Sequence, residues 1–275
     1  MRRNSILIIV GHGLYFPWTE ILYEGQRKTW LTWALPEHIK VVHFHGTPVG
    51  KIGLFLDKQH ELLRWNNRWT ALFQRSIDRS LALPFKSYIP RVTDSSLLDI
   101  EQKALHVHIP DLYFTQSWQN FAWLNYFIEE TAFDFVFTTT TSSLIRPHAL
   151  SEIVSTFDSK LPIYAGVKPY VGANFAAGNN RLLSRAAASL ILSNRHKLDF
   201  GEIEDVGIGS LLSRLGVTIA EIPSLHISSL AEFEEKKNLI ASHFHIRVKS
   251  GPLQQRNDIQ IMQEVFRYIN KEGLN

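Results

Sequence analysis

The sequence predicts an α/β fold in which helices flank a mostly parallel central sheet. Short apolar runs alternate along the chain with longer segments of helical spacing, the order typical of strands joined by helical crossovers. The chain has 275 residues, an ordinary length for one large α/β domain, and its 45% hydrophobic content is enough to bury a core. No linker, repeat or low-complexity tract divides the chain, so we expect a single domain over residues 1–275.

The period of the apolar residues predicts where each element lies. Strands are expected over residues 5–10, 39–45, 106–109, 133–137, 163–167 and 217–222. Helices are expected over residues 19–33, 54–83, 117–130, part of 142–157, 182–194, 206–215 and 258–270, with a polar loop after residue 222. Ligands of such sheets bind at the carboxyl ends of the strands, so the loops after Val10, Phe137 and Val167 and the segment around Asp205 are the candidate site.

Charge and cysteine content narrow the class of protein. Lysine and arginine number 29 and aspartate and glutamate 26, and the net charge of +3 is spread without long basic runs, so we expect no nucleic-acid partner. The absence of cysteine excludes disulfides, thiolate zinc sites and cysteine nucleophiles, and it suits a reducing compartment.

The apolar run at residues 6–10 is too short for a membrane span. We therefore expect a cytoplasmic protein, whose mild positive charge is compatible with peripheral attachment to the inner membrane.

Six consecutive hydroxyl side chains follow the strand that ends at Phe137: Thr138, Thr139, Thr140, Thr141, Ser142 and Ser143. Hydroxyl groups donate and accept hydrogen bonds, so this hydroxyl loop could bind phosphate oxygens or sugar hydroxyls. The same residues could cap the helix expected next, and both interpretations can hold because a helix N-terminus is itself an anion site. The Gly11-His12-Gly13 turn is not interpreted as an oxyanion hole, since the chain has no Gly-x-Ser-x-Gly elbow.

Small and acidic residues mark the segment between residues 169 and 205. Gly178, Asn179 and Arg181 precede an expected helix, where glycine allows either the close approach of a ligand or a tight structural turn. Glu204 and Asp205 precede another helix, where acidic side chains commonly interact only with the helix dipole. A carboxylate beside a ligand crevice can instead act as a general base, but the residues alone favour the dipole interpretation.

Histidines occur in alternating pairs, and two residues that alternate on a strand share one face. The pairs are His43 and His45, His106 and His108, and His243 and His245. Each pair could supply two metal ligands, but no carboxylate or cysteine completes a set at a clear spacing, which favours histidines of half-buried strands. The last pair is the best candidate for ligand binding, because Arg247 and Lys249 continue its alternation.

Several short motifs follow one another in a recognisable order. They are Arg27-Lys28-Thr29-Trp30, Pro110-Asp111, residues 133–137, Tyr164-Ala165-Gly166, Pro169-Tyr170, Ala177-Gly178, Leu183-Ser184-Arg185, Glu204-Asp205-Val206 with Gly209, and Leu215-Gly216-Val217. In this order they resemble the β-1,3-glycosyltransferase family that includes the Fringe proteins and the β-1,3-galactosyltransferases. The similarity extends over most of the chain and is dense only between residues 164 and 217.

The resemblance implies a GT-A-like Rossmann-type fold with a nucleotide-binding half at residues 1–145 and an acceptor and catalytic half at 146–275. It implies inverting transfer of a sugar from a nucleotide-sugar donor, a UDP-sugar in this family, to a glycan hydroxyl. The aspartate of the family's Glu-Asp-Val block is the base, which favours Asp205 here, with Glu204 as the second candidate. By analogy, the context is bacterial surface polysaccharide or lipopolysaccharide synthesis. The alternatives are a catalytically inert sugar- or nucleotide-binding homologue and a transferase that uses a CMP- or GDP-sugar.

One motif of the family is missing. Its metal-binding Asp-x-Asp aligns with Thr140-Thr141-Ser142, and neutral hydroxyls are poor ligands for Mn²⁺ or Mg²⁺. We therefore expect transfer without a metal cofactor, with the leaving diphosphate stabilised by other positive groups, among them Lys168, Arg181, Arg247 and Lys249. The full set of candidate donor-binding residues is Gly11, His12, Gly13, Arg27, Thr138, Thr139, Thr140, Thr141, Ser142, Lys168, Gly178, Asn179, Arg181, His243, His245, Arg247 and Lys249.

Overall fold

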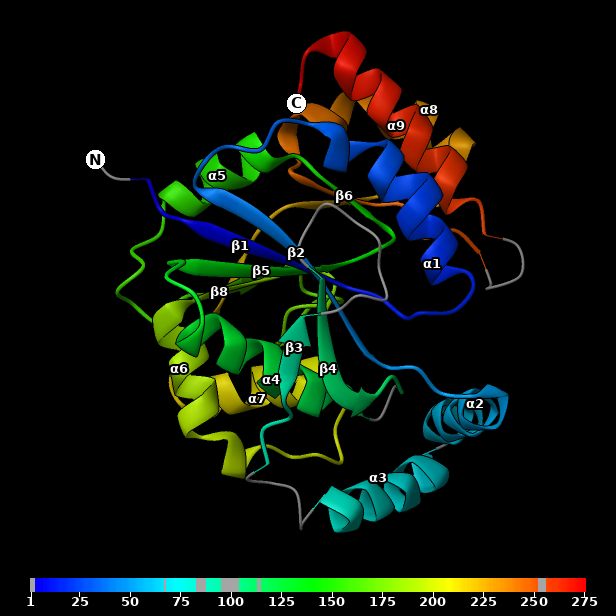
Figure 1. Ribbon diagram of the computed structural model, residues 1–275, viewed down its shortest axis with the longest axis vertical. Helices are drawn as coiled ribbons and strands as arrows, with labels where there is room; N and C mark the ends of the chain where they lie inside the picture. Colours follow the sequence, from blue (N-terminus) through cyan, green and yellow to red (C-terminus); the bar gives the residue numbers. More distant parts are fainter. Residues whose placement is uncertain (1–2, 67, 83–87, 95–103, 113–114, 252–255) are drawn as a thin grey trace.

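Eight strands form the central sheet of the computed structural model, which describes residues 3–66, 68–82, 88–94, 104–112, 115–251 and 256–275. Their order across the sheet is β3-β4-β2-β1-β5-β8-β7-β9 (Figure 1). The bounds are β1 Ile6–Gly11, β2 Ile39–Thr47, β3 Val92–Asp94, β4 Ala104–Pro110, β5 Phe135–Thr140, β7 Tyr164–Gly166, β8 Arg181–Ser184 and β9 Ile219–Glu221. Strands β4, β2, β1 and β5 run parallel, and so do β7 and β9, whereas β3 and β8 run antiparallel to their neighbours. The sheet is mixed, and the prediction of a mostly parallel sheet flanked by helices is confirmed.

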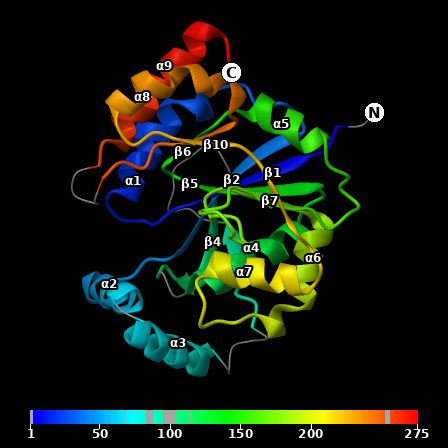
Figure 2. The same ribbon diagram turned by 180° about the vertical axis from the view of Figure 1, so that it is seen from behind.

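A second, three-stranded sheet joins β6 Ser143–Ile145, β10 Ser224–His226 and β11 His245–Arg247 in the order β10-β11-β6. The helices are α1 Trp18–Glu20, α2 Lys51–Asn66, α3 Arg68–Ala82, α4 Gln116–Glu129, α5 Pro147–Ser155, α6 Arg185–Ser193, α7 Glu204–Arg214, α8 Leu230–Lys236 and α9 Asp258–Glu272. Figures 1 and 2 show α4, α6 and α7 on one face of the central sheet and α1, α5, α8 and α9 on the other. Helices α2 and α3 form a hairpin that stands apart from both layers.

Strand β1 is buried on both faces, which explains its continuous apolar sequence. Ile6, Ile8 and Val10 belong to the core cluster shared with α5, α8 and α9. Leu7 and Ile9 belong to the cluster shared with α4, α6 and α7. Alternate side chains of one strand therefore tie the two helical layers to the sheet.

The observed elements differ from the predicted ones in the first third of the chain. Residues 19–33 form a series of short turns, Ile21–Gly25, Gln26–Lys28 and Trp30–Thr32, instead of one helix. The backbone of Thr29 leaves the helical region, with φ −128° and ψ −117°. The helix expected over residues 54–83 is divided into α2 and α3, and Leu83 lies outside the described residues.

Two further differences lie in the second half of the chain. Residues 181–184 form strand β8 between β5 and β7, and helix α6 begins only at Arg185, because the Ser184 hydroxyl accepts a hydrogen bond from the backbone N–H of Ala187 and caps it. The prediction of a polar loop after residue 222 is wrong. That segment contains β10, α8 and β11, and its apolar side chains are buried in the core, among them Leu225, Ile227, Phe233, Ile240, Phe244 and Ile246.

Within the described part of the chain, no helix combines the length and the apolar character that crossing a bilayer requires.

Candidate functional site

Several loops meet at one edge of the central sheet. The carboxyl ends of the parallel strands β1, β2, β4 and β5 lie there. Because β8 runs antiparallel to β5, its first residue, Arg181, lies at the same edge, opposite Thr138. Strand β7 also ends there, with Gly166 opposite Arg181. The edge therefore gathers the loop after β1, the hydroxyl loop and residues 167–180.

Glu204 begins helix α7 and is held by a buried arginine. Its Oε1 accepts a 2.5 Å hydrogen bond from Nη1 of Arg181, and both side chains are almost fully buried. Nη2 of Arg181 donates to Oδ1 of Asn120 at 2.6 Å, and the guanidinium carbon lies 5.7 Å from the centre of the Trp123 ring. Burial raises the pKa of Glu204, and the Arg181 cation opposes that rise. Glu204 is thus committed to a charge-paired, hydrogen-bonded network inside the protein.

Asp205, the next residue, is only half-buried. Burial raises its pKa, while the Arg181 cation and hydrogen bonds from the backbone N–H groups of Val206 and Gly178 act in the opposite direction. A Cβ built on Gly178 would lie 3.4 Å from Oε2 of Glu204 and 4.0 Å from Cβ of Asp205, so the loop backbone lies against both carboxylates. A partly exposed carboxylate with a raised pKa can accept a proton from a hydroxyl group.

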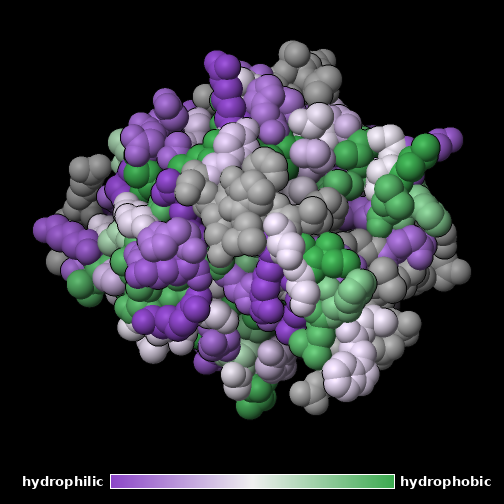
Figure 3. All heavy atoms as spheres, turned by 90° about the horizontal axis from the view of Figure 1, so that it is seen from below, coloured by the Kyte–Doolittle hydropathy of each residue, from purple (hydrophilic) through white to green (hydrophobic). Residues whose placement is uncertain are grey.

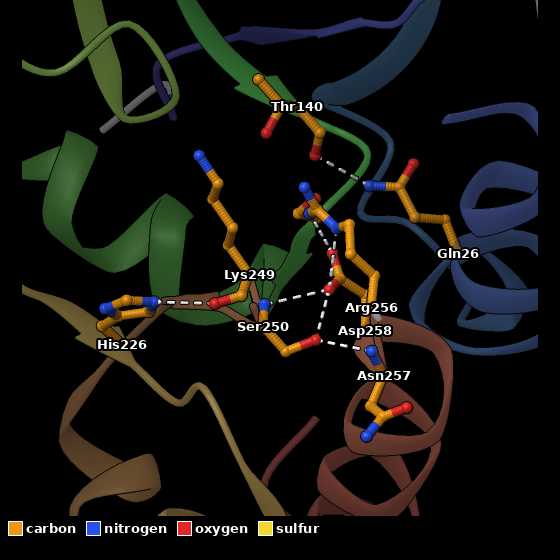
Figure 4. Close-up of polar contacts among 9 residues, drawn as sticks. Gln26, Thr140, His226, Lys249, Ser250, Arg256, Asn257 and Asp258 are labelled. Carbon is orange, nitrogen blue, oxygen red and sulfur yellow. Dashed lines mark hydrogen bonds and ion pairs between the residues drawn. The ribbon is translucent and has the colours of Figure 1, made fainter. Parts of the chain in front are cut away.

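Asn179 connects these carboxylates to a pair of arginines. Its Oδ1 accepts a hydrogen bond of 2.6 Å from Nη1 of Arg247. Burial lowers the pKa of Arg247, and the Arg256 cation acts in the same direction while Asp258 opposes it. Arg256 donates to Oγ of Ser142 at 2.7 Å and forms a buried ion pair with Asp258 (Figure 4). Two guanidinium groups therefore lie beside the hydroxyl loop.

The hydroxyl loop belongs to strands and does not cap a helix. Residues 138–140 end β5 and Ser143 begins β6, whereas α5 starts only at Pro147. The capping interpretation is therefore wrong. Gln26 holds the loop in place, since its amide donates to the carbonyl oxygens of Thr140 at 3.1 Å and Ser143 at 2.9 Å (Figure 4 shows the first). Thr140 is half-buried, while the other five hydroxyl residues are buried.

The positions of the missing metal motif do not fit a divalent cation. Thr140, Thr141 and Ser142 offer neutral hydroxyl oxygens, and the Ser142 hydroxyl already contacts the guanidinium of Arg256. These positions therefore offer no anionic oxygen, the kind of ligand that Mn²⁺ and Mg²⁺ prefer. Across the described residues, no three histidine, cysteine, aspartate or glutamate side chains are placed to hold a metal ion.

Histidine rings form a row across the ends of β1, β2 and β4. The ring centroids are 5.9 Å apart between His43 and His12, 5.7 Å between His12 and His45, 5.3 Å between His45 and His106, and 4.5 Å between His106 and His108. Burial lowers the pKa of His12 to about 3 and also lowers the pKa of His45. The His12 and His45 rings are therefore neutral at physiological pH, and they can donate or accept hydrogen bonds without adding charge.

Asp111 lies at the same strand ends. Burial raises its pKa to about 6; a hydrogen bond from Gln119 opposes the rise and the charge of Asp57 adds to it. A Cβ built on Gly13 would lie 3.1 Å from Oδ2 of Asp111, so the loop after β1 lies against this carboxyl group. Within the described residues, Oδ2 of Asp111 and Nε2 of His12 are buried without a hydrogen-bond partner. Such atoms are available to a bound ligand or water.

Two predicted residues lie at strand ends of this edge. Gly11 ends β1 opposite Thr140, and a Cβ there would lie 2.9 Å from the Phe44 ring, so a side chain at this position would require the ring to shift. Lys249 follows β11 and is exposed, and its carbonyl oxygen lies 3.2 Å from Nε2 of His226. In the view of Figure 4, the Lys249 side chain extends toward the end of the strand that carries Thr140.

His245 links strands inside the molecule. Its Nδ1 lies 2.6 Å from Oγ of Ser224, and its Nε2 lies 3.0 Å from Oγ of Ser143 and 3.4 Å from Oγ1 of Thr139. Burial lowers its pKa to about 3, with the charge of Arg247 acting in the same direction. The ring is fully buried, so the structure gives it a bridging position between the two sheets and not a position on the surface of the site.

Three predicted donor-binding residues make contacts elsewhere, outside the hydroxyl loop and the loop at Gly178 and Asn179. The Arg27 guanidinium lies 5.1 Å from the centre of the Tyr23 ring. Nζ of Lys168 lies 3.8 Å from Oε2 of the exposed Glu221. Nδ1 of His243 lies 2.7 Å from a backbone carbonyl oxygen of the preceding turn. None of these contacts involves Gly178, Asn179 or the hydroxyl loop.

The sequence did not single out Gln26, Asn120, Arg256 and Asp258 as site residues. Gln26 and Asn120 are buried amides, which need specific hydrogen-bond partners, but only the folded structure shows that they are buried. Asp258 stands at the start of a helix, where the helix dipole is a sufficient explanation, so nothing in the sequence connects it with Arg256.

No protein-family model matches the sequence, and no curated protein matches it significantly. Three solved structures of glycosyltransferases are similar in part. Apo GlyE of Streptococcus pneumoniae TIGR4 is 10% identical with a TM-score of 0.45, and the match covers 99% of this chain and 63% of GlyE. A glycosyltransferase involved in glycosylation of the major capsid of PBCV-1 is 10% identical with a TM-score of 0.41 and coverage of 95% and 100%. Mouse xyloside xylosyltransferase 1 is 9% identical with a TM-score of 0.39 and coverage of 89% and 97%.

The chain thus spans less than two thirds of the length of GlyE. Identities of 10% or less with TM-scores below 0.5 assign neither a family nor an activity to the protein.

Proposed function

We propose that this protein is a glycosyltransferase that takes its sugar from a nucleotide-sugar donor. The observation that carries the proposal is the loop at Gly178 and Asn179, which contacts the Asp205 carboxylate on one side and the Arg247 guanidinium on the other. Glycosyl transfer from a nucleotide sugar needs a base for the acceptor hydroxyl and positive charge for the leaving diphosphate. One short loop connects groups suited to both tasks.

Asp205 is the proposed base. It removes the proton from a hydroxyl group of a glycan acceptor while that oxygen attacks the anomeric carbon from the face opposite the leaving group, which inverts the configuration. The contacts support Asp205 over Glu204, because Glu204 is ion-paired with Arg181 and almost fully buried. The raised pKa of Asp205 makes it a stronger base than an ordinary aspartate.

Arg247 is the proposed counter-charge of the diphosphate, with Lys249 at the exposed side; Arg256 is already committed to its buried ion pair with Asp258. Guanidinium groups bind phosphate oxygens through paired hydrogen bonds, and they carry their charge at every physiological pH. Because the Thr140–Ser142 positions do not fit a divalent cation, transfer in this proposal proceeds without a metal.

The nucleotide lies at the ends of β1 and β4 in this proposal. His12 Nε2 and Asp111 Oδ2 supply unsatisfied polar atoms there, and Gly13 lets the chain approach closely. We propose UDP as the nucleotide, which the family resemblance supports, and by analogy a cytoplasmic role in bacterial surface polysaccharide or lipopolysaccharide synthesis.

A catalytically inert sugar- or nucleotide-binding protein is the second candidate. The observation that favours it is the hydroxyl loop, which lacks carboxylates and is largely buried in hydrogen bonds to the protein itself.

Incubation of the protein with UDP-, GDP- and CMP-sugars in excess EDTA tests both proposals, with melting temperature and nucleotide release as readouts. We expect a UDP-sugar to raise the melting temperature, because it binds only the folded state, and we expect UDP to be released. Binding without release under any acceptor supports the inert candidate. Release that disappears in EDTA and returns with Mn²⁺ contradicts metal-independent transfer.

A further inference from the structure

Helices α2 and α3 expose large apolar side chains to solvent. Ile52 is 77% exposed, Trp69 80% and Phe73 69%, and Phe55, Leu56, Leu72 and Ile77 are also exposed. Figure 3 views the molecule from the side on which α3 lies in Figure 1, and hydrophobic side chains gather on the part of that face where the hairpin lies. Apolar surface gathered in this way marks a contact with a protein or a lipid.

The exposed side chains form one stripe on each helix. On α2, residues 52, 55 and 56 have the spacing of a single helical face. On α3, residues 69, 72, 73 and 77 do the same. Both stripes are exposed to solvent, and we call the apolar surface of the two stripes together the hairpin face.

Salt bridges hold the inner side of the hairpin. Arg79 Nη2 lies 2.6 Å from Oδ2 of Asp199, and Arg75 Nη1 lies 3.1 Å from Oε1 of Glu202. A Cβ on Gly201 would lie 2.8 Å from the carbonyl oxygen of Arg75, so α3 packs closely on the segment that leads into α7. These contacts fix which side of α3 faces the protein and leave the apolar stripe outside.

Lysines flank the stripe of α2. Lys51 and Lys58 are exposed and lie along one border of the face formed by residues 52, 55 and 56. Asp57 is half-buried and Asp78 is buried, so the hairpin side chains that the structure describes include no exposed carboxylate. Exposed aromatic and aliphatic residues bordered by lysine are the composition of a helix that lies in a membrane interface.

We propose that the hairpin face binds the surface of an anionic lipid bilayer. Trp69 and Phe73 insert between the headgroups, and Lys51 and Lys58 contact lipid phosphates through their flexible side chains. A second copy of the chain fits the face less well. A two-fold interface centred on it would bring the lysines of both copies together without an exposed carboxylate from the described hairpin to pair them.

Flotation of the full chain with lipid vesicles tests the proposal independently of any transferase activity. We expect the protein to float with mixed phosphatidylcholine–phosphatidylglycerol vesicles. The double substitution Trp69→Ser and Phe73→Ser should lower the partition coefficient at least about tenfold, because two large apolar groups leave the interface. Lys51→Glu with Lys58→Glu should lower it about tenfold on mixed vesicles and far less on pure phosphatidylcholine.

The matched control is Leu161→Ser with Leu239→Ser, which removes exposed leucines outside the hairpin and should leave partitioning unchanged. Melting temperatures of all variants establish that they are folded. Failure of the folded wild-type protein to float with anionic vesicles overturns the proposal. So does an equal loss in the leucine control, or a dimer in solution that Trp69→Ser with Phe73→Ser dissociates, since that result assigns the face to a second copy.

Discussion

Two adjacent carboxylates at the start of α7 have different surroundings. Glu204 is almost fully buried against Arg181, whose other nitrogen is bound by Asn120. Asp205 is half-buried beside the backbone of Gly178. A difference of one residue along the chain therefore separates a carboxylate held in a buried ion pair from one that is partly exposed to solvent.

Substitution Asp205→Asn should leave the protein folded and lower kcat by at least about two orders of magnitude, the usual contribution of a general base. In the wild type, the base must be deprotonated, so kcat/KM should fall as pH falls through the pKa of Asp205. Burial raises that pKa above the ordinary aspartate value of 3.8, and the acidic limb should therefore lie above 3.8. Steady-state kinetics across pH with the donor found by nucleotide release measure both effects.

The comparison variant is Glu204→Gln. It leaves the Arg181 cation buried without its partner, and we expect a loss of about 3–5 kcal/mol in the free energy of unfolding. Near-normal turnover by Asp205→Asn, with the turnover defect in Glu204→Gln instead, contradicts the assignment of the base.

Helix α7 is positioned by glycine as well as by charge. A Cβ on Gly209 would lie 2.2 Å from Cβ of Phe175 and 2.7 Å from its Cα, so the helix rests directly on the loop that continues to Gly178 and Asn179. Gly207, two residues earlier, has more room, and its nearest atoms would be 3.5 Å from a Cβ. Helix α7 thus contains one glycine, Gly209, that leaves no room for a methyl group, and a second glycine, Gly207, that leaves room for one and can serve as a control.

The substitution Gly209→Ala should lower the free energy of unfolding by about 1–3 kcal/mol, because the added methyl group pushes α7 away from the loop at Phe175. Gly207→Ala should leave stability unchanged or raise it by about 0.5–1 kcal/mol through the better helix propensity of alanine. Urea denaturation of both variants measures the difference. Equal effects of the two substitutions contradict the close approach of the helix and the loop.

The two sheets of the molecule meet at His245. Its ring nitrogens contact Ser224 in β10 and Ser143 in β6, and Thr139 in β5 lies 3.4 Å away. Burial lowers the pKa of this histidine from 6.5 to about 3, so the folded protein holds the ring neutral. Because this ring contacts strands of both sheets, the contacts between the central sheet and the three-stranded sheet depend on a neutral His245.

The sign of the pH effect follows from linkage. Below about pH 6.5 the unfolded chain takes up a proton at His245 that the folded protein does not, so stability falls as pH decreases until about pH 3. At pH 5 this costs the wild type about 2 kcal/mol, and the variant His245→Gln lacks the effect. We expect the stability difference between wild type and variant to shrink by about 2 kcal/mol between pH 7.5 and pH 5. Urea denaturation at the two pH values checks this, and a difference that does not change with pH contradicts it.

Much of the fold follows from the periodicity of the sequence. The strands around Ile8 and Phe137 are apolar runs buried on both faces, and a continuous apolar run of this length predicts a buried strand without information from other parts of the chain. Strand β8 was missed because residues 181–184 precede a helix with compatible local spacing, and only pairing with β5 and β7 makes them a strand. Tertiary contacts override a local preference of this size.

In the candidate site, too, local sequence signals predict some residues, while others are brought in only by contacts between distant parts of the chain. Gly178, Asn179 and Arg181 lie in or beside one turn-rich segment, and Glu204 and Asp205 form an acidic helix start further along the chain, so local signals mark both groups. Their partners come from far away: Asn120 lies 61 residues from Arg181, and Arg247 lies 68 residues from Asn179. Distances of this kind in the chain leave no periodic signal.

Composition and apolar spacing were sufficient to predict the α/β class, the position of most strands along the chain, and the edge of the sheet where the loops converge. The physical reason is that burial of apolar side chains acts on every helix and strand in the same way. The choice between Asp205 and Glu204, the pairing of Arg256 with Ser142 and Asp258, and the exposed face of the α2–α3 hairpin depend on which side chains meet. Hydrogen bonds and ion pairs are short-ranged and directional, so these features exist only once the chain has brought distant residues within a few ångströms.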